Sequence, residues 1–256
     1  MAKYLIGTSG WHYDHWRGSF YPEKLAKAGW LEFYACHFSA VELNNSFYRL
    51  PSEAAFTSWY RSSPGDFTFA VKVSRFITHF KWLQDSIEAV DNFITKVRIL
   101  GDKLGPLLYQ LPPNMQRNDD VLETFLSGLP QEMEHVFEFR HRSWLQEQVY
   151  KILRKYGVGF CVFDMPSVNC PLVVTADFAY VRFHGSGELY SGAYSDGELV
   201  GWAQRLSALA KNLSRVYIYF NNDAEANAVR NAVTLSGFLQ KVGQVTVRSN
   251  LKEAGK

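Results

Sequence analysis

The chain has 256 residues, of which 47% are hydrophobic and 20% charged, and its formal net charge is +2 at pH 7. A globular chain of this length buries about three quarters of the surface that its unfolded form exposes, so its core needs no disulfide or structural metal. The near-neutral charge excludes the strongly basic surface of a protein dedicated to coating nucleic acid.

Three cysteines, Cys36, Cys161 and Cys170, are odd in number, and none has the CxxC spacing of a redox or metal motif. We expect them to be buried free thiols in a reducing compartment. No secretory signal opens the sequence, and no apolar run approaches the about 20 residues of a membrane span. The sequence therefore predicts a soluble, cytoplasmic protein with no membrane partner.

Short runs rich in Val, Ile, Phe and Tyr alternate with longer stretches of helical periodicity. The predicted strands are residues 4–7, 39–44, 67–73, 106–111, 136–140, 158–164, 179–184 and 215–221. The predicted helices include residues 23–36, 85–100, 120–127, 145–156, 196–211 and 223–240. Asp120 and Asp196 are expected to cap two helices, and Gly157 to end another. Residues 48–65 are expected to be partly helical at best, and residues 166–177 to form a loop.

Eight strands that alternate with helices predict a parallel sheet with crossover helices, and eight is the strand number of a TIM barrel. A doubly wound open sheet would usually carry a glycine-rich phosphate-binding turn after its first strand. The turn here, Gly7-Thr8-Ser9-Gly10-Trp11, matches neither GxGxxG nor GxxxxGK[ST]. No linker interrupts the chain. We therefore expect an α/β fold, a single (β/α)₈ TIM-type barrel domain over residues 1–256.

Polar side chains recur late in seven of the predicted strands. Residues two apart share a face of a strand, and on this rule one face is polar and the other apolar. The polar set is Glu42, Asn44, Lys72, Gln110, Glu138, Arg140, Asp164, Arg182, His184, Tyr219 and Asn221. Helices cover the outer face of a barrel, so we expect this set to point inward at the carboxyl ends of the strands, where TIM-barrel active sites lie.

Three carboxylates in this set balance three cations, so the set can also be interpreted as an ion-pair lattice that only stabilises the top of the barrel. Apolar packing is often as stabilising as buried ion pairs, which favours a working site. Rings at Trp11, His12, Tyr13, His15 and Trp16 follow the first strand. They could stack on a ligand or plug the barrel mouth. Asp223 is expected to cap the last helix.

A metal site has no local motif, because HExxH, HxxxH and CxxC spacings are absent. Glu42, Glu138, Asp164 and His184 could still form a Mg²⁺ or Mn²⁺ site from separate strands, although three neighbouring cations argue against it. No GxSxG nucleophile motif is present, and no cofactor is required by any motif.

Several longer segments carry a resemblance to a known family. They are Gly7-Thr8-Ser9-Gly10-Trp11, Phe20-Tyr21-Pro22, Val41-Glu42-Leu43-Asn44, Phe47-Tyr48-Arg49-Leu50-Pro51, Phe69-Ala70-Val71-Lys72-Val73, Gln110-Leu111-Pro112, Glu138-Phe139-Arg140, Tyr180-Val181-Arg182-Phe183-His184-Gly185 and Tyr219-Phe220-Asn221-Asn222-Asp223. Together they span most of the chain and resemble the YecE-like family, a domain of unknown function. The resemblance implies a TIM-type barrel similar in outline to sugar isomerases and apurinic-site endonucleases, and it implies no established reaction.

The leading hypothesis is an enzyme that acts on a phosphorylated or otherwise anionic substrate, with a nucleic-acid phosphodiester as one candidate. In this hypothesis the cations Lys72, Arg140 and Arg182 hold the anion. The acid–base groups come from Glu42, Glu138, Asp164 and His184. Asn44, Gln110 and Asn221 orient the substrate, and Trp11 or Tyr13 covers it. The alternatives are a non-catalytic module that binds single-stranded nucleic acid or a nucleotide, and a metal-dependent sugar isomerase or lyase.

Overall fold

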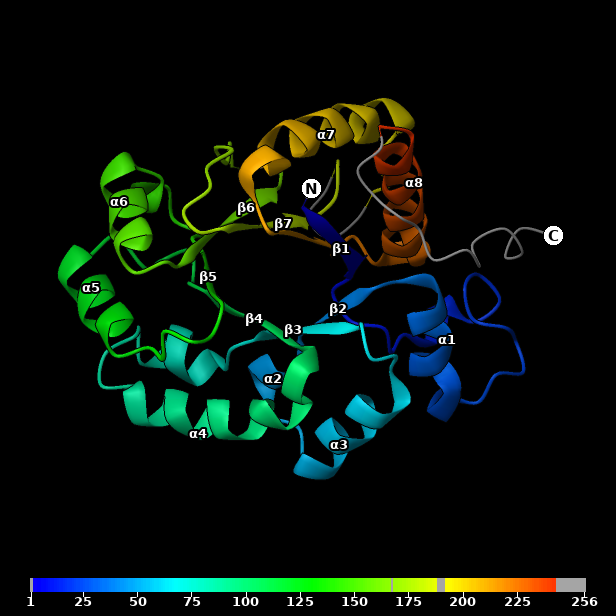
Figure 1. Ribbon diagram of the computed structural model, residues 1–256, viewed down its shortest axis with the longest axis horizontal. Coiled ribbons are helices and arrows are strands. Elements are labelled where there is room, and N and C mark those ends of the chain that lie inside the picture. Colours follow the sequence, from blue (N-terminus) through cyan, green and yellow to red (C-terminus); the bar gives the residue numbers. More distant parts are fainter. Residues whose placement is uncertain (1, 167, 188–191, 243–256) are drawn as a thin grey trace.

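Eight parallel strands form one sheet in the order β1-β8-β7-β6-β5-β4-β3-β2 (Figure 1). The computed structural model describes residues 2–166, 168–187 and 192–242. The strands are β1 (Lys3–Thr8), β2 (Ala40–Leu43), β3 (Thr68–Lys72), β4 (Leu104–Gln110), β5 (His135–Glu138), β6 (Gly159–Asp164), β7 (Phe178–Phe183) and β8 (Arg215–Phe220). The predicted (β/α)₈ barrel is confirmed, and every predicted strand exists with ends that differ by at most two residues.

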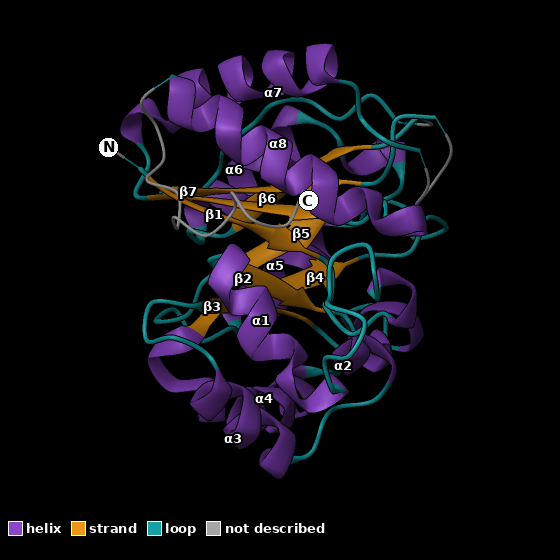
Figure 2. Ribbon diagram, turned by 90° about the vertical axis from the view of Figure 1, so that its right-hand side faces the viewer, coloured by secondary structure: helices purple, strands orange, loops and turns teal. Residues whose placement is uncertain are grey.

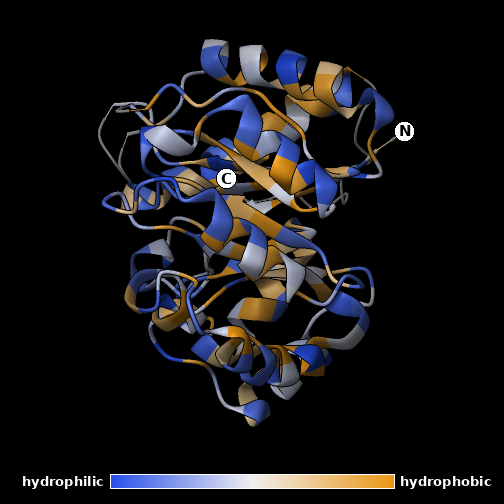
Figure 3. Cartoon of the chain, turned by 90° about the vertical axis from the view of Figure 1, so that its left-hand side faces the viewer, coloured by the Kyte–Doolittle hydropathy of each residue, from blue (hydrophilic) through white to orange (hydrophobic). Residues whose placement is uncertain are grey.

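Helices surround the strands (Figure 1). They are α1 (Trp30–His37), α2 (Asn45–Tyr48), α3 (Glu53–Ser62), α4 (Ile87–Val97), α5 (Asp119–Ser127), α6 (Glu147–Lys155), α7 (Asp196–Leu209) and α8 (Asn227–Lys241), with a π-helical turn at Phe76–Phe80. In α6, Val149 and Leu153 are buried, whereas Lys151 and Arg154 are exposed. This alternation is typical of helices that pack one face on a sheet, and Figure 3 shows hydrophobic strands between helices of mixed hydropathy.

The helix caps differ from the prediction. Asn118, not Asp120, caps α5, and Ser195, not Asp196, caps α7 through a capping box. Both aspartates lie instead in the first turn, where the positive end of the helix dipole stabilises a carboxylate. Gly157 does end α6, with a positive φ of 64°.

Two helix boundaries are also corrected. The helix expected over residues 23–36 begins only at Trp30, because the Arg17 guanidinium binds the carbonyl oxygens of Glu23 and Leu25 at 2.8 and 2.9 Å. Residues 48–65 are partly helical, as expected, since they contain α3. The last helix begins at residue 227 rather than 223.

The barrel closes between β1 and β2 without a continuous ladder. The described residues form a single bridge there, Ser9 with Glu42. The hydroxyl of Tyr34, from α1, accepts from the Thr8 backbone N–H at 2.8 Å and donates to the Ala40 carbonyl at 3.2 Å. A Cβ on Gly7 would lie 1.9 Å from that carbonyl oxygen, so only glycine permits this approach. A side chain thus replaces part of the missing ladder.

A second short ladder lies between β5 and β6, where Val136 pairs with Gly159 and Phe137 with Phe160. The two weak junctions divide the sheet into two halves, β2–β5 and β6–β7–β8–β1. Figure 2 shows α7 and α8 over one half and α1, α3 and α4 beside the other. We call these the β2–β5 half and the β6–β1 half.

The barrel interior combines small residues on one side with large ones on the other. Ala40 on β2 and Ala70 on β3 pack in the same inner cluster as Tyr180 on β7 and Tyr217 and Tyr219 on β8. The small side chains leave room for the tyrosines to fill the interior, which makes the barrel a packed core rather than a pore.

Candidate functional site

Arg182, near the end of β7, is the centre of the inward polar set. Its Nη2 donates to Glu42 Oε1 at 2.8 Å, and its Nη1 donates to Glu138 Oε2 at 2.5 Å. The Arg182 side chain is 1% exposed and both carboxylates are fully buried. One guanidinium of the β6–β1 half therefore joins two carboxylates of the β2–β5 half. This arrangement is called the Arg182 network below.

Glu42 has further donors. Ser9 Oγ donates to its Oε1 at 2.7 Å, and the Tyr180 hydroxyl donates to its Oε2 at 2.6 Å. Burial alone would raise the pKa of this carboxyl group, but Arg182 and the two hydroxyl groups outweigh it and lower the pKa. Glu42 is thus an ionised carboxylate whose oxygens are both engaged.

Glu138 is engaged in the same way. Gln110 Nε2 donates to its Oε1 at 2.8 Å, and Arg140 Nε pairs with the same oxygen. Burial opposes ionisation, yet Arg140 and Arg182 hold the pKa of Glu138 well below its usual range. The predictions that Glu42, Gln110, Glu138 and Arg182 share one inner face agree with this geometry.

Arg140 lies at the outer edge of the network. Its Nη1 contacts the Met165 sulfur at 2.9 Å, its Nη2 lies 3.0 Å from His184 Nε2, and its guanidinium lies over the Phe163 ring at 5.4 Å. A thioether is a weak acceptor, so the Nη1 donor can exchange it for a ligand oxygen. Arg140 is the cation of the network that is best placed to bind an anion.

His184 is neutral at physiological pH. Burial lowers the pKa of this imidazole to about 4, although Glu138 favours its charged form. Nε2 lies 3.0 Å from Arg140 Nη2, and Nδ1 lies 3.2 Å from Asn221 Nδ2. A neutral imidazole has one acceptor nitrogen, so it accepts from one of these two donors. The two contacts place the ring between Arg140 and Asn221.

Lys72, at the end of β3, completes the charged set. Its Nζ lies 4.0 Å from the centre of the Phe47 ring and has no hydrogen-bond or ion-pair partner within the described parts of the chain. Burial and Arg182 lower the pKa of this amine to about 7, against the opposing effects of Glu138 and Glu42. At neutral pH a large fraction of this lysine is uncharged.

Asp164 does not join the network, and its predicted inward position is wrong. Its carboxyl group faces α7, where it interacts with Tyr194 and Trp202, and burial raises its pKa. The strand alternates as expected, but its faces are reversed: Cys161 and Phe163 point inward on β6. An outward carboxyl group is tolerated here because helix α7 and its preceding loop supply hydrogen-bond partners.

The rings of the β1 loop pack together as a plug. Trp11 is 7% exposed and meets Trp59 edge-to-face at 5.3 Å, and the Tyr13 hydroxyl donates to the Ser9 carbonyl at 2.6 Å. Trp16 Nε1 donates to Asp223 Oδ1 at 2.7 Å. The prediction that Asp223 caps the last helix is wrong, because α8 begins at Asn227 and the Asp223 side chain makes no cap hydrogen bond. Its carboxylate instead accepts from Trp16 and so connects this loop to the end of β8.

Three inward polar atoms lack hydrogen-bond partners among the described residues: the buried Oδ1 of Asn44, the buried hydroxyl of Tyr219 and the buried Nε of Arg182. Leu43 pairs with Val71, so Asn44 and Lys72 follow side by side at the ends of neighbouring strands. A buried acceptor without a donor is costly, and a bound ligand is one way to satisfy it.

The donor set considered above for a divalent metal does not come together. Within the described residues no group of three or more His, Cys, Asp or Glu side chains is arranged around a common point. The oxygens of Glu42 and Glu138 accept from arginine, tyrosine, serine and glutamine, and Asp164 faces away. The residues therefore do not fit a resident metal ion.

Sequence reasoning missed several members of the site. Tyr180 lies two residues before Arg182 on the same strand, so the alternation rule could have found it. Ser9 and Met165 lie beyond strand ends, where alternation no longer applies. Cys161 Sγ lies 3.7 Å from Glu138, and burial raises the pKa of its thiol well above the usual value, so it is unreactive. Of the three free cysteines, Cys36 is exposed rather than buried as expected.

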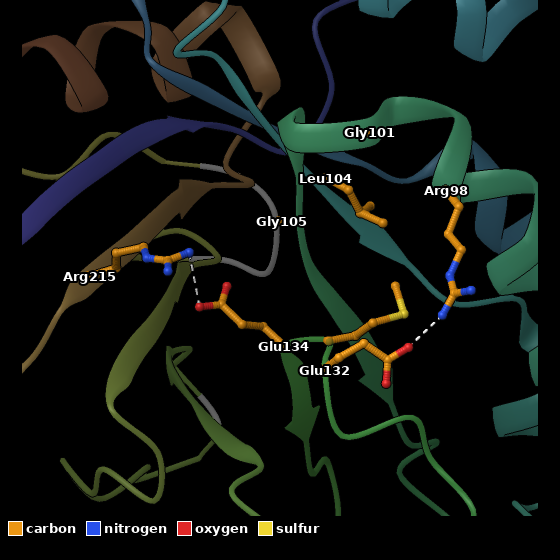
Figure 4. Close-up of a pocket in the computed structure, with 8 residues that line it drawn as sticks. Arg98, Gly101, Leu104, Gly105, Glu132, Glu134 and Arg215 are labelled. Atoms are coloured by element: carbon orange, nitrogen blue, oxygen red, sulfur yellow. Dashed lines mark hydrogen bonds and ion pairs between the residues drawn. The ribbon is translucent and has the colours of Figure 1, made fainter.

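A separate cavity of about 550 Å³ lies at the opposite end of the barrel, near the starts of β4 and β8 (Figure 4). Arg215 pairs with Glu134 at 3.2 Å and Arg98 with Glu132 at 2.5 Å on its wall. The Tyr217 hydroxyl also donates to Glu134 at 2.6 Å. Its charges are paired within the chain, which is typical of the stabilising end of a TIM barrel.

Comparison with known proteins identifies the family. The model of the family described as "Protein of unknown function DUF72" matches residues 5–254. The chain belongs to the DUF72 family. Two curated DUF72 relatives are the UPF0759 proteins YunF of Bacillus subtilis, 26% identical over 88% of this chain and 91% of YunF, and YecE of Escherichia coli K12, 28% identical over 62% and 68%. The predicted resemblance to YecE is thus confirmed.

A solved DUF72 protein from Thermotoga maritima has the same fold, with a TM-score of 0.86 and 31% identity over 93% of this chain and 99% of that one. The names of these relatives state a family and do not state an activity. None of the helices in the described regions is long and apolar enough to cross a membrane.

Proposed function

We propose that this DUF72 protein is an enzyme that acts on an anionic small-molecule substrate at the carboxyl ends of its barrel strands. The observation that supports this most is the charge of the site. Two carboxylates, Glu42 and Glu138, are matched by two arginines, so a protonated Lys72 leaves one positive charge in excess. A buried site with excess positive charge favours an anion.

Arg140 is the group that receives the anion in this proposal. Both terminal nitrogens of Arg182 are engaged by carboxylates and its side chain is buried, whereas Arg140 has one N–H on a thioether sulfur and keeps some exposure. A carboxylate or phosphate oxygen at that N–H would make a charge-assisted hydrogen bond. Gln110, Asn44 and Asn221 would then orient the rest of the substrate.

The acid–base group that best suits neutral pH is Lys72. A catalytic acid or base works best when its pKa lies near the operating pH. The pKa values of Glu42 and Glu138 are lowered and that of His184 is about 4, whereas that of Lys72 is about 7. Asp164 lies on the other face of β6. The proposal therefore places acid–base chemistry on Lys72 rather than on the four residues predicted from the sequence.

The test is the binding of inorganic phosphate to the protein, which is measured by thermal shift and by calorimetry. We expect phosphate to stabilise the wild type and to lose at least about tenfold in affinity in Arg140→Gln, because a charged hydrogen bond contributes roughly 1.5–3 kcal/mol. The matched control is Arg142→Gln, since Arg142 is exposed two residues further on. Equal phosphate binding in both variants would contradict the role of Arg140.

A phosphodiester substrate, or simple binding of single-stranded nucleic acid, is favoured by a second observation. The Arg75 guanidinium lies 5.4 Å from the ring centres of Tyr48 and Phe80, which are 69% and 66% exposed. These rings follow β2 and β3, on the same end of the barrel as Arg140. Exposed rings beside a cation suit stacking on bases, which contributes about 1–3 kcal/mol per base.

End-labelled intact, abasic and single-stranded DNA and RNA test this second candidate in a gel assay with EDTA or divalent metals. Cleavage that Glu138→Gln abolishes would support a phosphodiesterase. Salt-sensitive binding without cleavage would support a binding module. If neither occurs, the anionic substrate is a small metabolite and not a nucleic acid.

A further inference from the structure

Lys72 has surroundings that differ from those of an anion-binding lysine. Its Nζ lies over the Phe47 ring, 4.0 Å from the ring centre, and makes no hydrogen bond or ion pair to any described residue. The side chain nevertheless keeps part of its surface accessible. The cation–π contact with the ring replaces only part of the hydration that an ammonium loses here, so the site also accommodates the neutral amine.

Four charged groups, on or just beyond three strands, act on this amine. Arg182 from β7 and Arg140 from the end of β5 disfavour its protonation, and the carboxylates Glu138 and Glu42 favour it. Both carboxylates are already bound by arginine, so the cations and burial dominate. His79 lies beyond Phe47, with ring centres 5.0 Å apart, and burial together with Lys72 lowers its pKa to about 4. A desolvated lysine beside other cations is the arrangement that activates an amine as a nucleophile.

We infer that Lys72 forms an imine with an aldehyde or ketone group of the substrate. This inference rests on the proposed function and narrows it to an anionic carbonyl compound, with its anionic group on Arg140 and its carbonyl carbon at Lys72 Nζ. The unpartnered Asn44 Oδ1, beside Lys72 at the strand ends, can accept from a hydroxyl group on the reacting carbon.

The step balances without any co-reactant. The neutral Nζ attacks the carbonyl carbon, the carbonyl π electrons move to oxygen, and one amine proton passes to that oxygen to give a carbinolamine. The C–O bond then breaks as the nitrogen lone pair forms the C=N bond, and the hydroxyl leaves with a second proton as water. The sum is amine plus carbonyl giving imine plus water, with no change in oxidation state.

Reductive trapping tests the inference on the full-length protein. Glyoxylate, an anionic aldehyde, and propionaldehyde, a neutral one, are each added at pH 7 with cyanoborohydride, and labelled lysines are identified by peptide mass spectrometry. An ordinary lysine is less than about 0.1% neutral at pH 7. We therefore expect glyoxylate to label Lys72 at least about tenfold faster than the exposed lysines of the same sample.

The two aldehydes separate this inference from the proposed anion site. Arg140→Gln should slow labelling by both aldehydes, because the loss of a neighbouring cation reduces the neutral fraction of Lys72, but it should slow glyoxylate labelling more, since only glyoxylate also loses its anion contact. Arg142→Gln should affect neither. Labelling of Lys72 by both aldehydes that Arg140→Gln slows to the same extent would uphold the imine and overturn the anion site. No preference for Lys72 with either aldehyde would overturn the imine, whatever the phosphate titration shows. Loss of the labelled peptide in Lys72→Met confirms the assignment of the site.

Discussion

Lys72 illustrates how a residue that we propose to be catalytic can reduce the stability of the fold. Its amine is buried on an aromatic ring without a partner in the described chain, and its pKa is lowered, so the folded state binds protons less readily than the unfolded state. Between pH 7 and the pKa of an ordinary lysine, the unfolded state holds the extra proton, and wild-type stability therefore rises with pH.

We predict that Lys72→Met raises the free energy of unfolding at pH 7 by about 1–3 kcal/mol, because an apolar side chain replaces an uncompensated buried amine. The gain should shrink as the pH rises toward 10, because the unfolded-state amine then approaches its own pKa and the cost of losing its proton on folding falls. Urea denaturation at the two pH values measures it. Lys24→Met, at an exposed lysine, should change stability by less than about 0.5 kcal/mol. A less stable Lys72→Met would show that the amine makes net favourable contacts.

His184 predicts a loss of stability on mild acidification. Its folded pKa of about 4 lies below the ordinary value of about 6.5, so between these values the unfolded state takes up a proton that the folded state does not. Stability should therefore fall as pH decreases from 6.5 to 4 and level off below. The melting temperature followed over this range should fall less steeply in His184→Gln. Equal slopes in both proteins would assign the acid sensitivity to other groups.

Side-chain alternation predicted most of the inward set, because it depends only on strand geometry. It placed Glu42, Lys72, Gln110, Glu138, Arg182 and His184 correctly, since the opposite faces of their strands are apolar and covered by helices. It failed at Asp164, because polarity was taken to mark the inner face. On β6 the inner residues are Cys161 and Phe163, and the outer carboxyl group finds partners on and just before α7. Which face is inward depends on tertiary contacts that the strand sequence does not contain.

At the scale of elements, the Tyr34 side chain of α1 makes hydrogen bonds to two strands whose backbones would normally bond to each other. Its hydroxyl bonds to backbone groups of β1 and β2, where the ladder is interrupted. We predict that Tyr34→Phe lowers the free energy of unfolding by about 1–3 kcal/mol, because the buried Thr8 N–H loses its acceptor. Tyr60→Phe, at a partly exposed tyrosine, is the control. Denaturant titration checks both, and equal stabilities would show that another group replaces the hydroxyl.

Strand positions were predictable within two residues, but helix starts and the β1–β2 junction were not. Hydrophobic runs identify strands directly, whereas the first turn of a helix is decided by competition among neighbouring polar residues. Asn118 and Asp120 can both cap α5, and only backbone geometry selects Asn118. The role of Tyr34 depends on a contact between a helix and the two strands that flank it in sequence, and no local pattern marks it.

At the scale of the whole molecule, the Arg182 network holds the two halves of the barrel together where their backbone pairing is weakest. Arg182→Met should leave Glu42 without a cation and weaken the neutralisation of Glu138. We predict a loss of about 3–5 kcal/mol at pH 7, the cost of leaving a buried charge unpaired. The loss should be smaller near pH 4, because the carboxylates can then be protonated. Arg154→Met, which breaks an exposed ion pair with Glu147, should cost less than about 1 kcal/mol. Guanidinium denaturation of both variants measures the two losses of stability, and equal losses would show that Arg182 does not stabilise the buried carboxylates.

The same network also specifies which halves can associate. Glu42 lies in the β2–β5 half, and its only cation among the described residues is Arg182 of the other half. Two β2–β5 halves from different molecules, docked on each other in a symmetric dimer, would bury two such carboxylates without Arg182. Because each unpaired buried charge is costly, this wrong assembly is disfavoured relative to the barrel closed within one chain. The residues at the centre of the site therefore also help to ensure that each barrel is built from two unlike halves.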